Sequence, residues 1–107
     1  MDVTPLINAD TPIIESYKSG IFKVSGQIYD HNIMVGMNGV NSWDGSFESL
    51  PPHDVLIVGT GKIQVFPDAK TRAQTPMEAM STDAACRTYN ALISDGRHVL
   101  VCLQRYL

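Results

Sequence analysis

Runs of hydrophobic residues along the chain predict strands of two kinds. The continuous apolar run at residues 55–58 is typical of a strand that is covered on both faces. Residues 62–66 alternate between polar and apolar side chains, which predicts a half-buried strand that ends at Pro67. The largely apolar stretch at 97–103 predicts a central strand. Shorter apolar stretches predict further strands at residues 13–17, 33–35 and 77–80.

Turn-forming residues divide the first half of the chain. The Ser-Gly pair at 25–26 separates the apolar stretches 21–24 and 27–29, which predicts a β-hairpin. The Asn-Gly pair at 38–39 marks a second turn. We expect the residues that follow it, 40–45, to be irregular, and residues 47–50 to form one helical turn that Pro51-Pro52 stops.

The clearest helical pattern follows residue 80. Ser81, Thr82 and Asp83 are candidates for the N-cap, and Asp83 places a negative charge at the positive end of the helix dipole. The Asp-Gly pair at 95–96 is a stop signal, because glycine readily adopts the left-handed cap. Apolar side chains recur at helical spacing and predict a buried stripe of Ala85, Tyr89, Leu92 and Ile93.

Length and composition indicate one packed α/β domain. The chain has 107 residues and a mass of 11.7 kDa, and 44% of its residues are hydrophobic against 18% charged. This size and composition support a single hydrophobic core. We expect one domain over residues 1–107, of which 1–12 form a loose arm.

The charge balance and the apolar pattern narrow the possible partners and the location. Eight basic residues against 11 acidic ones give a net charge of −3, with no basic cluster of the kind that binds nucleic acid. No apolar stretch approaches the roughly 20 residues that span a bilayer. The N-terminus does not resemble a signal peptide, and two cysteines make no disulfide framework. We therefore expect a cytoplasmic protein that binds no nucleic acid and has no transmembrane segment.

Two motifs that suggest cofactor or metal chemistry fail on detail. The glycines at 59–61 suggest a nucleotide loop, but Leu56 and Ile63 stand where a Walker loop needs glycine and Ser/Thr. A tight turn between strands explains them better. The three histidines are scattered; His98 and Cys102 could share a strand face but supply only two ligands. We expect no metal, no cofactor and no catalytic set.

The polar face of the predicted helix has two interpretations. Asp83, Arg87, Asn90 and Ser94 lie opposite the apolar stripe, and Asp83 and Arg87 are spaced for a surface ion pair. On one interpretation this is a solvated face; on the other, Arg87 and Asn90 project into a groove that binds a carboxylate, a phosphate or a partner's backbone. Cys86, beside Arg87, is either a reactive thiol or, more commonly for cysteine, a core residue.

Residues 80–90 followed by Leu92, then residues 95–99, closely resemble the signature of the Mth938-like family, also called domain of unknown function 498. Phe22 and Tyr29, Trp43, and the strand end at 56–61 follow in the order of that family. The resemblance implies a three-layer α/β fold with a central mixed β-sheet, a β-hairpin extension and one main helix. Thr75-Pro76 stands where the family has a continuous helix end, so we expect the helix between Phe66 and Met80 to be reduced to one or two turns.

The resemblance also implies a candidate site and a class of function. The family includes a mitochondrial assembly factor of respiratory complex I, so we expect a non-enzymatic binding or assembly protein with a possible protein partner, as a monomer or homodimer. The alternative is a small-molecule-binding protein or an enzyme with a polar groove around Cys86, Arg87 and Asn90. A third possibility is that Arg87 and Asn90 pin the helix to the turn at 59–61. We expect one binding groove bordered by Trp43, Gly59, Thr60, Gly61, Cys86, Arg87, Thr88, Tyr89 and Asn90.

Overall fold

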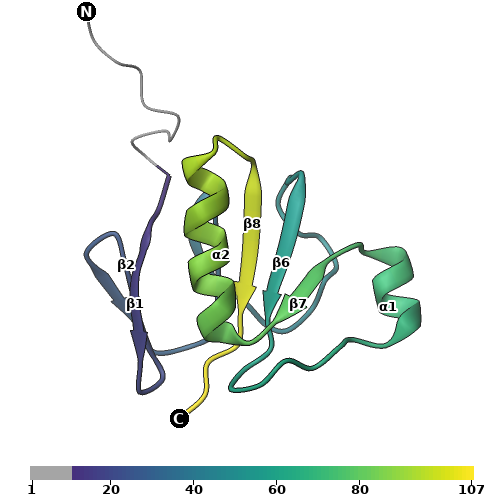
Figure 1. Ribbon diagram of the computed structural model, residues 1–107, viewed down its shortest axis with the longest axis horizontal. Coiled ribbons are helices and arrows are strands. Elements are labelled where there is room, and N and C mark those ends of the chain that lie inside the picture. Colours follow the sequence, from purple (N-terminus) through teal and green to yellow (C-terminus); the bar gives the residue numbers. More distant parts are fainter. Residues whose placement is uncertain (1–10) are drawn as a thin grey trace, which may run out of the picture.

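The computed structural model describes residues 11–107 and contains two β-sheets and two helices (Figure 1). The predicted arm at residues 1–12 falls outside the described part of the chain, apart from its last two residues. The elements are, in chain order, β1 (Ile14–Lys18), β2 (Ile21–Val24), β3 (Gln27–Tyr29), β4 (Ile33–Gly36), β5 (Gly39–Ser42), β6 (Val55–Gly59), α1 (Ala69–Gln74), β7 (Glu78–Met80), α2 (Thr82–Ser94) and β8 (Val99–Leu103).

The larger sheet is mixed and has five strands in the order β5-β4-β8-β6-β7. β8 is its centre: it runs antiparallel to β4 and parallel to β6. All five residues of β8 are buried, as the apolar sequence of this strand predicts. β6 is buried from its second residue onward, which confirms the prediction for 55–58.

The smaller sheet is the predicted hairpin with one added strand. β2 pairs antiparallel with β1 on one side and with β3 on the other. In β2 the side chains alternate, with Phe22 and Val24 buried while Ile21 and Lys23 are exposed. The buried side packs toward α2 and joins the main core, so this sheet extends the domain sideways (Figure 1).

The helix α2 covers one face of the larger sheet (Figure 1). Ser81 is its N-cap, and the Ser81 side chain accepts a hydrogen bond from the backbone N–H of Ala84. The buried face carries Thr82, Ala85, Cys86, Tyr89 and Ile93, while Leu92 is half-buried. The predicted apolar stripe is therefore confirmed, with Thr82 and Cys86 added to it.

The other face of the larger sheet is covered by a second apolar cluster. Trp43 lies in it together with Leu56, Val58, Leu100 and Cys102. The indole Nε1 of Trp43 donates a hydrogen bond to the carbonyl of Ser46 at 2.9 Å, which fixes the loop after β5. This loop thus takes the place of a second covering helix on that face.

Three local predictions are wrong. Residues 62–66 form no strand, the chain bends at 62–63, and all five of their side chains are exposed. Residues 39–42 form β5, where the sequence predicts an irregular segment at 40–45, because the turn at 37–38 folds them back onto β4. Residues 47–50 form a non-helical turn, with Ser49 at a φ of 57°. The reduced helix between Phe66 and Met80 is confirmed as the six-residue α1.

Candidate functional site

The turn at Gly59, Thr60 and Gly61 packs against the first residue of α2. The hydroxyl of Thr82 accepts a hydrogen bond from the N–H of Gly61 at 2.9 Å and donates one to the carbonyl of Gln104 at 2.6 Å. The N–H of Thr82 donates to the carbonyl of Gly61 at 2.8 Å. Thr82 is fully buried, so this residue ties the end of β6, the start of α2 and the segment after β8 together.

Gly59 is required by close packing. A Cβ placed on it would lie 3.0 Å from the Cα of Thr82 and 3.1 Å from the Thr82 hydroxyl. Such contacts are tighter than most contacts of a Cβ atom, so a side chain here would require Thr82 to shift by a few tenths of an ångström. The glycines at this turn therefore serve the junction between β6 and α2, which agrees with the interpretation of 59–61 as a tight turn.

Thr60 shapes the loop that follows. Its hydroxyl donates to the carbonyl of Ile63 at 2.7 Å and accepts from the N–H of Val65 at 2.9 Å, while its own N–H donates to the carbonyl of Met80 at 2.8 Å. The side chain of Thr60 thus helps to hold this loop beside β7. The sequence signal for this role is the threonine of the glycine-flanked turn, which we had assigned to the groove.

A cleft of about 240 Å³ lies between β1 and α2. Asn90 bridges its two sides: the side-chain oxygen accepts from the N–H of Ile14 at 3.0 Å, and the side-chain nitrogen donates to the carbonyl of Ile14 at 2.7 Å. Asn90 therefore joins α2 to the edge of the smaller sheet, not to the turn at 59–61 that the pinning hypothesis named. The cleft is lined by Ile14, Glu15, Ser16, Tyr17, Asp83, Cys86, Arg87 and Asn90.

The ion pair predicted between Asp83 and Arg87 is not formed among residues 11–107. Asp83 instead accepts a short hydrogen bond from the hydroxyl of Tyr106. This bond raises the pKa of the Tyr106 hydroxyl to about 12, because the negative carboxylate favours the protonated phenol. Arg87 remains exposed at the border of the cleft. A local helical spacing could not reveal that the chain end supplies the partner of Asp83.

Cys86 and Tyr89, the candidate nucleophile and acid of the enzyme hypothesis, are both buried with a raised pKa, which disfavours such a role. Burial raises the pKa of the Cys86 thiol to about 12, and the nearby Asp83 carboxylate adds to the shift. The hydroxyl of Tyr89 is buried and donates to the carbonyl of Pro12 at 2.8 Å, and burial raises its pKa as well. Both side chains lie in the main core, which favours the structural interpretation of Cys86 over a reactive thiol.

Alkylation should reveal the protected state of Cys86. At pH 8 we expect iodoacetamide to modify Cys86 about a hundredfold more slowly in the folded protein than in denaturant, because little thiolate is present below the raised pKa. Between pH 7 and pH 9 the slow rate should rise about tenfold per unit. Peptide mapping by mass spectrometry separates Cys86 from Cys102, which is also buried. Equal rates in folded and unfolded chains would contradict the assignment.

The predicted site residues thus fall into separate places. Gly59, Thr60 and Gly61 form the turn at the start of α2, and Trp43 lies on the opposite face of the sheet. Tyr89 is buried in the core, and Thr88 is half-buried and does not line the cleft between β1 and α2. That cleft takes in Cys86, Arg87 and Asn90. Whether those three bind a ligand stays a prediction.

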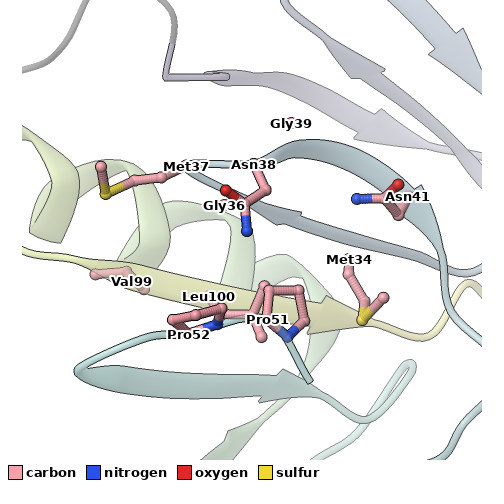
Figure 2. Close-up of a pocket in the computed structure, with 10 residues that line it drawn as sticks. All are labelled: Met34, Gly36, Met37, Asn38, Gly39, Asn41, Pro51, Pro52, Val99 and Leu100. Carbon is pink, nitrogen blue, oxygen red and sulfur yellow. The ribbon is translucent and has the colours of Figure 1, made fainter. Parts of the chain in front are cut away.

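Residues 11–107 contain further hollows. One of about 320 Å³ lies around Trp43 in the loop after β5, and one of about 430 Å³ lies between that loop and α1. Figure 2 shows a hollow between the β4–β5 turn, Pro51-Pro52 and the start of β8. Its volume of about 10 Å³ is at the lower limit for one water molecule. Within the described residues, no group of three or more His, Cys, Asp or Glu side chains is placed to hold a metal ion.

The family assignment rests on a match over most of the chain. The sequence profile described as "Protein of unknown function (DUF498/DUF598)" matches residues 14–104, which include both sheets and both helices. The chain belongs to this family. A 13 kDa major membrane protein of Francisella tularensis is 31% identical over 51 residues, which are 43% of this chain. The match spans 42% of that protein, less than half of its length.

Solved structures share the fold over nearly the whole chain. A protein of Bordetella parapertussis is 28% identical, with a TM-score of 0.78 over 92% of this chain and 98% of its own. An outer membrane protein of Bartonella henselae is 23% identical, with a TM-score of 0.75 over 90% of this chain and 96% of its own. A Bordetella pertussis protein described as a Mth938-like domain is 24% identical, with a TM-score of 0.73 over 97% of this chain and 92% of its own. The mixed α/β, Mth938-like fold that the sequence predicts is therefore confirmed.

Neither helix among the described residues has the length and apolar character needed to cross a bilayer. The expected cytoplasmic location, protein partner and oligomeric state stay predictions. Sequence reasoning missed three features of the region around α2: the buried hydroxyl of Thr82, the bond of Tyr106 to Asp83, and the exposure of residues 62–66. Each depends on contacts between distant segments.

Proposed function

We propose that this chain is a non-enzymatic protein-binding domain that acts in the assembly of membrane or respiratory complexes, with the cleft between β1 and α2 as its partner site. The observation that carries the proposal is the exposed Arg87 guanidinium at the border of that cleft, in a place where Cys86 and Tyr89 are unsuited to catalysis. Arginine is among the residues that most often anchor protein interfaces.

The shape of the cleft favours a segment of a partner protein over a small metabolite. Small-molecule pockets usually have volumes of about 300–1,000 Å³ and enclose most of the ligand. The cleft here is smaller, about 240 Å³, and lies between an edge strand and an exposed helix face. A carboxylate on the partner would meet Arg87 in a charge-assisted, two-pronged hydrogen bond. These features support binding of a partner segment that places one carboxylate opposite Arg87.

The relatives supply a second line of support. The Francisella tularensis relative is named a major membrane protein, and the Bartonella henselae structure is described as an outer membrane protein. The family that the sequence resembles includes an assembly factor of a membrane-bound complex. We carry these associations to this chain as part of the proposal: the partner would be a subunit of a membrane complex.

Affinity capture from the native host tests the role of Arg87. We expect wild type to retain a subunit of a membrane complex, and Arg87→Glu to retain it at least about tenfold less, the loss typical of an interface anchor. Arg97→Glu is the control, because Arg97 is also exposed, lies just beyond α2 and does not line the cleft. Equal capture by wild type and Arg87→Glu, or capture of no such subunit, would contradict the proposal.

A further inference from the structure

The loop between β6 and α1 exposes apolar side chains that a folded domain usually buries. Ile63, Val65 and Phe66 have 67%, 52% and 62% of their surface exposed. They are close in sequence and lie outside both core clusters. Single exposed apolar residues are ordinary, but several together mark a surface that contacts another molecule or a membrane.

The loop is held in its exposed position by polar contacts on its inner side. The Gln64 side chain donates to the carbonyl of Ala79 in β7 at 2.8 Å, so Gln64 faces the body of the domain. Thr60 bonds the backbone of Ile63 and Val65. Ile63 and Val65, on either side of Gln64 in the sequence, are both exposed. The apolar side chains are thus presented outward by a fixed backbone.

Basic side chains accompany these apolar ones. Lys62, Lys70 and Arg72 are all exposed, and the Arg72 guanidinium lies over the Phe66 ring, 5.7 Å from its centre. They are three of the eight basic residues of a chain whose net charge is −3. Asp68 and, in β7 beside the loop, Glu78 are exposed acidic residues of the same region; Asp68 is the N-cap of α1 and accepts from the N–H of Thr71 at 2.7 Å.

The short helix α1 belongs to the same surface. It has no buried residue, and it lies at the end of the molecule opposite the smaller sheet (Figure 1). Glu48 and Asp68 face the hollow on one side of α1. Lys70 and Arg72 are the two charged residues of α1 itself, and both are exposed. We call Lys62, Ile63, Val65, Phe66, Lys70 and Arg72 the loop patch.

We propose that the loop patch binds the surface of an anionic phospholipid bilayer. A bilayer surface has an apolar layer and a layer of phosphates. The apolar side chains of the patch can enter the acyl boundary, while its lysine and arginine side chains contact the headgroup phosphates. In this contact Ile63, Val65 and Phe66 supply the apolar side chains, and Lys62, Lys70 and Arg72 supply the charges that meet anionic lipid. The patch gives the chain a membrane contact of its own.

This site is separate from the cleft of the proposed function. The cleft is built by β1 and α2, whereas the loop patch lies between β6 and β7. Variants of Arg87 test one site and variants of the loop patch test the other. Loss of either binding activity can therefore be observed while the other is retained.

Vesicle co-sedimentation of the full chain tests the patch. We expect wild type to bind vesicles of phosphatidylcholine mixed with phosphatidylglycerol, and to bind pure phosphatidylcholine far less. Replacing Lys70 and Arg72 with glutamine should lower partitioning about thirtyfold, at about one kcal/mol for each basic residue. Ile63→Ser combined with Phe66→Ser should lower it at least about tenfold. Added salt should weaken binding of the wild type.

Matched variants elsewhere on the surface separate a specific site from general stickiness. Ile28→Ser removes an isoleucine of similar exposure, 65%, from β3, and Lys18→Gln with Arg97→Gln removes two exposed cations. These controls should keep wild-type vesicle binding. Because every substituted side chain is exposed, circular dichroism should show a retained fold in all variants.

Three outcomes would overturn the proposal. The first is no preference of wild type for anionic vesicles. The second is unchanged binding by the loop-patch variants. The third is concentration-dependent dimerisation, or capture of a protein from membrane-free lysate, that the loop-patch variants abolish while vesicle binding is absent in wild type.

Discussion

Replacing Phe22 with alanine is expected to lower the free energy of unfolding by about 3–5 kcal/mol, a large part of the stability of a domain of this size. Phe22 is fully buried and stacks on Tyr17 with ring centres 4.4 Å apart. It belongs to the cluster that joins the smaller sheet to α2. Its removal leaves a cavity where these two parts meet. Urea denaturation followed by circular dichroism measures the loss.

The neighbouring residue provides the control for this prediction. Ile21 lies on the same strand but points to the other face and is 40% exposed. Ile21→Ala should therefore lower the free energy of unfolding by well under half as much as Phe22→Ala, because the isoleucine side chain is already partly in contact with water in the folded protein. Similar losses for both variants would contradict the placement of the hairpin on the core.

Replacing Thr82 with valine is expected to lower the free energy of unfolding by about 3 kcal/mol. Valine has nearly the same shape, so the change removes hydrogen bonds without leaving a cavity. Without the hydroxyl, the N–H of Gly61 and the carbonyl of Gln104 lose their partner at a fully buried position. Unpaired buried groups of this kind cost roughly 1–3 kcal/mol each. Thermal and urea unfolding measure the difference.

A second threonine on α2 tests whether the effect comes from the buried bonds. Thr88 is half-buried on the same helix, and Thr88→Val makes the same chemical change. We expect it to cost less than about 0.5 kcal/mol, as is usual for surface positions. Equal losses of stability in both variants would mean that placing valine in a helix causes the effect, and not the loss of the hydrogen bonds at the Gly61 junction.

The elements predictable from sequence are those whose signal is local. The apolar run of β6, the apolar stretch of β8 and the capped, periodic α2 carry their own pattern, and all three are observed. Residues 62–66 carry an equally clear alternation yet form no strand. A strand needs a neighbour to pair with, and this loop is held instead by the side chains of Thr60 and Gln64. Alternation alone cannot tell these cases apart.

Of the candidate site, only the residues that share one face of α2 could be predicted from the sequence. The spacing of Arg87 and Asn90 correctly places both beside one cleft. The element that completes the cleft, β1, comes from the other end of the described chain, and Asn90 meets Ile14 across 76 residues of sequence. Nothing local marks that contact. The same holds for Asp83, whose partner Tyr106 follows the last strand.

The central place of β8 has a consequence for synthesis on the ribosome. β4 and β6 never pair with each other, and only Val99–Leu103, which pairs with both, joins them in one sheet. A nascent chain that has emerged only as far as α2 therefore holds the β4–β5 hairpin and the β6–β7 pair as two unjoined fragments. Translation of β8 is the step that lets the larger sheet close, and until then the apolar faces of the two fragments lack the strand that joins them.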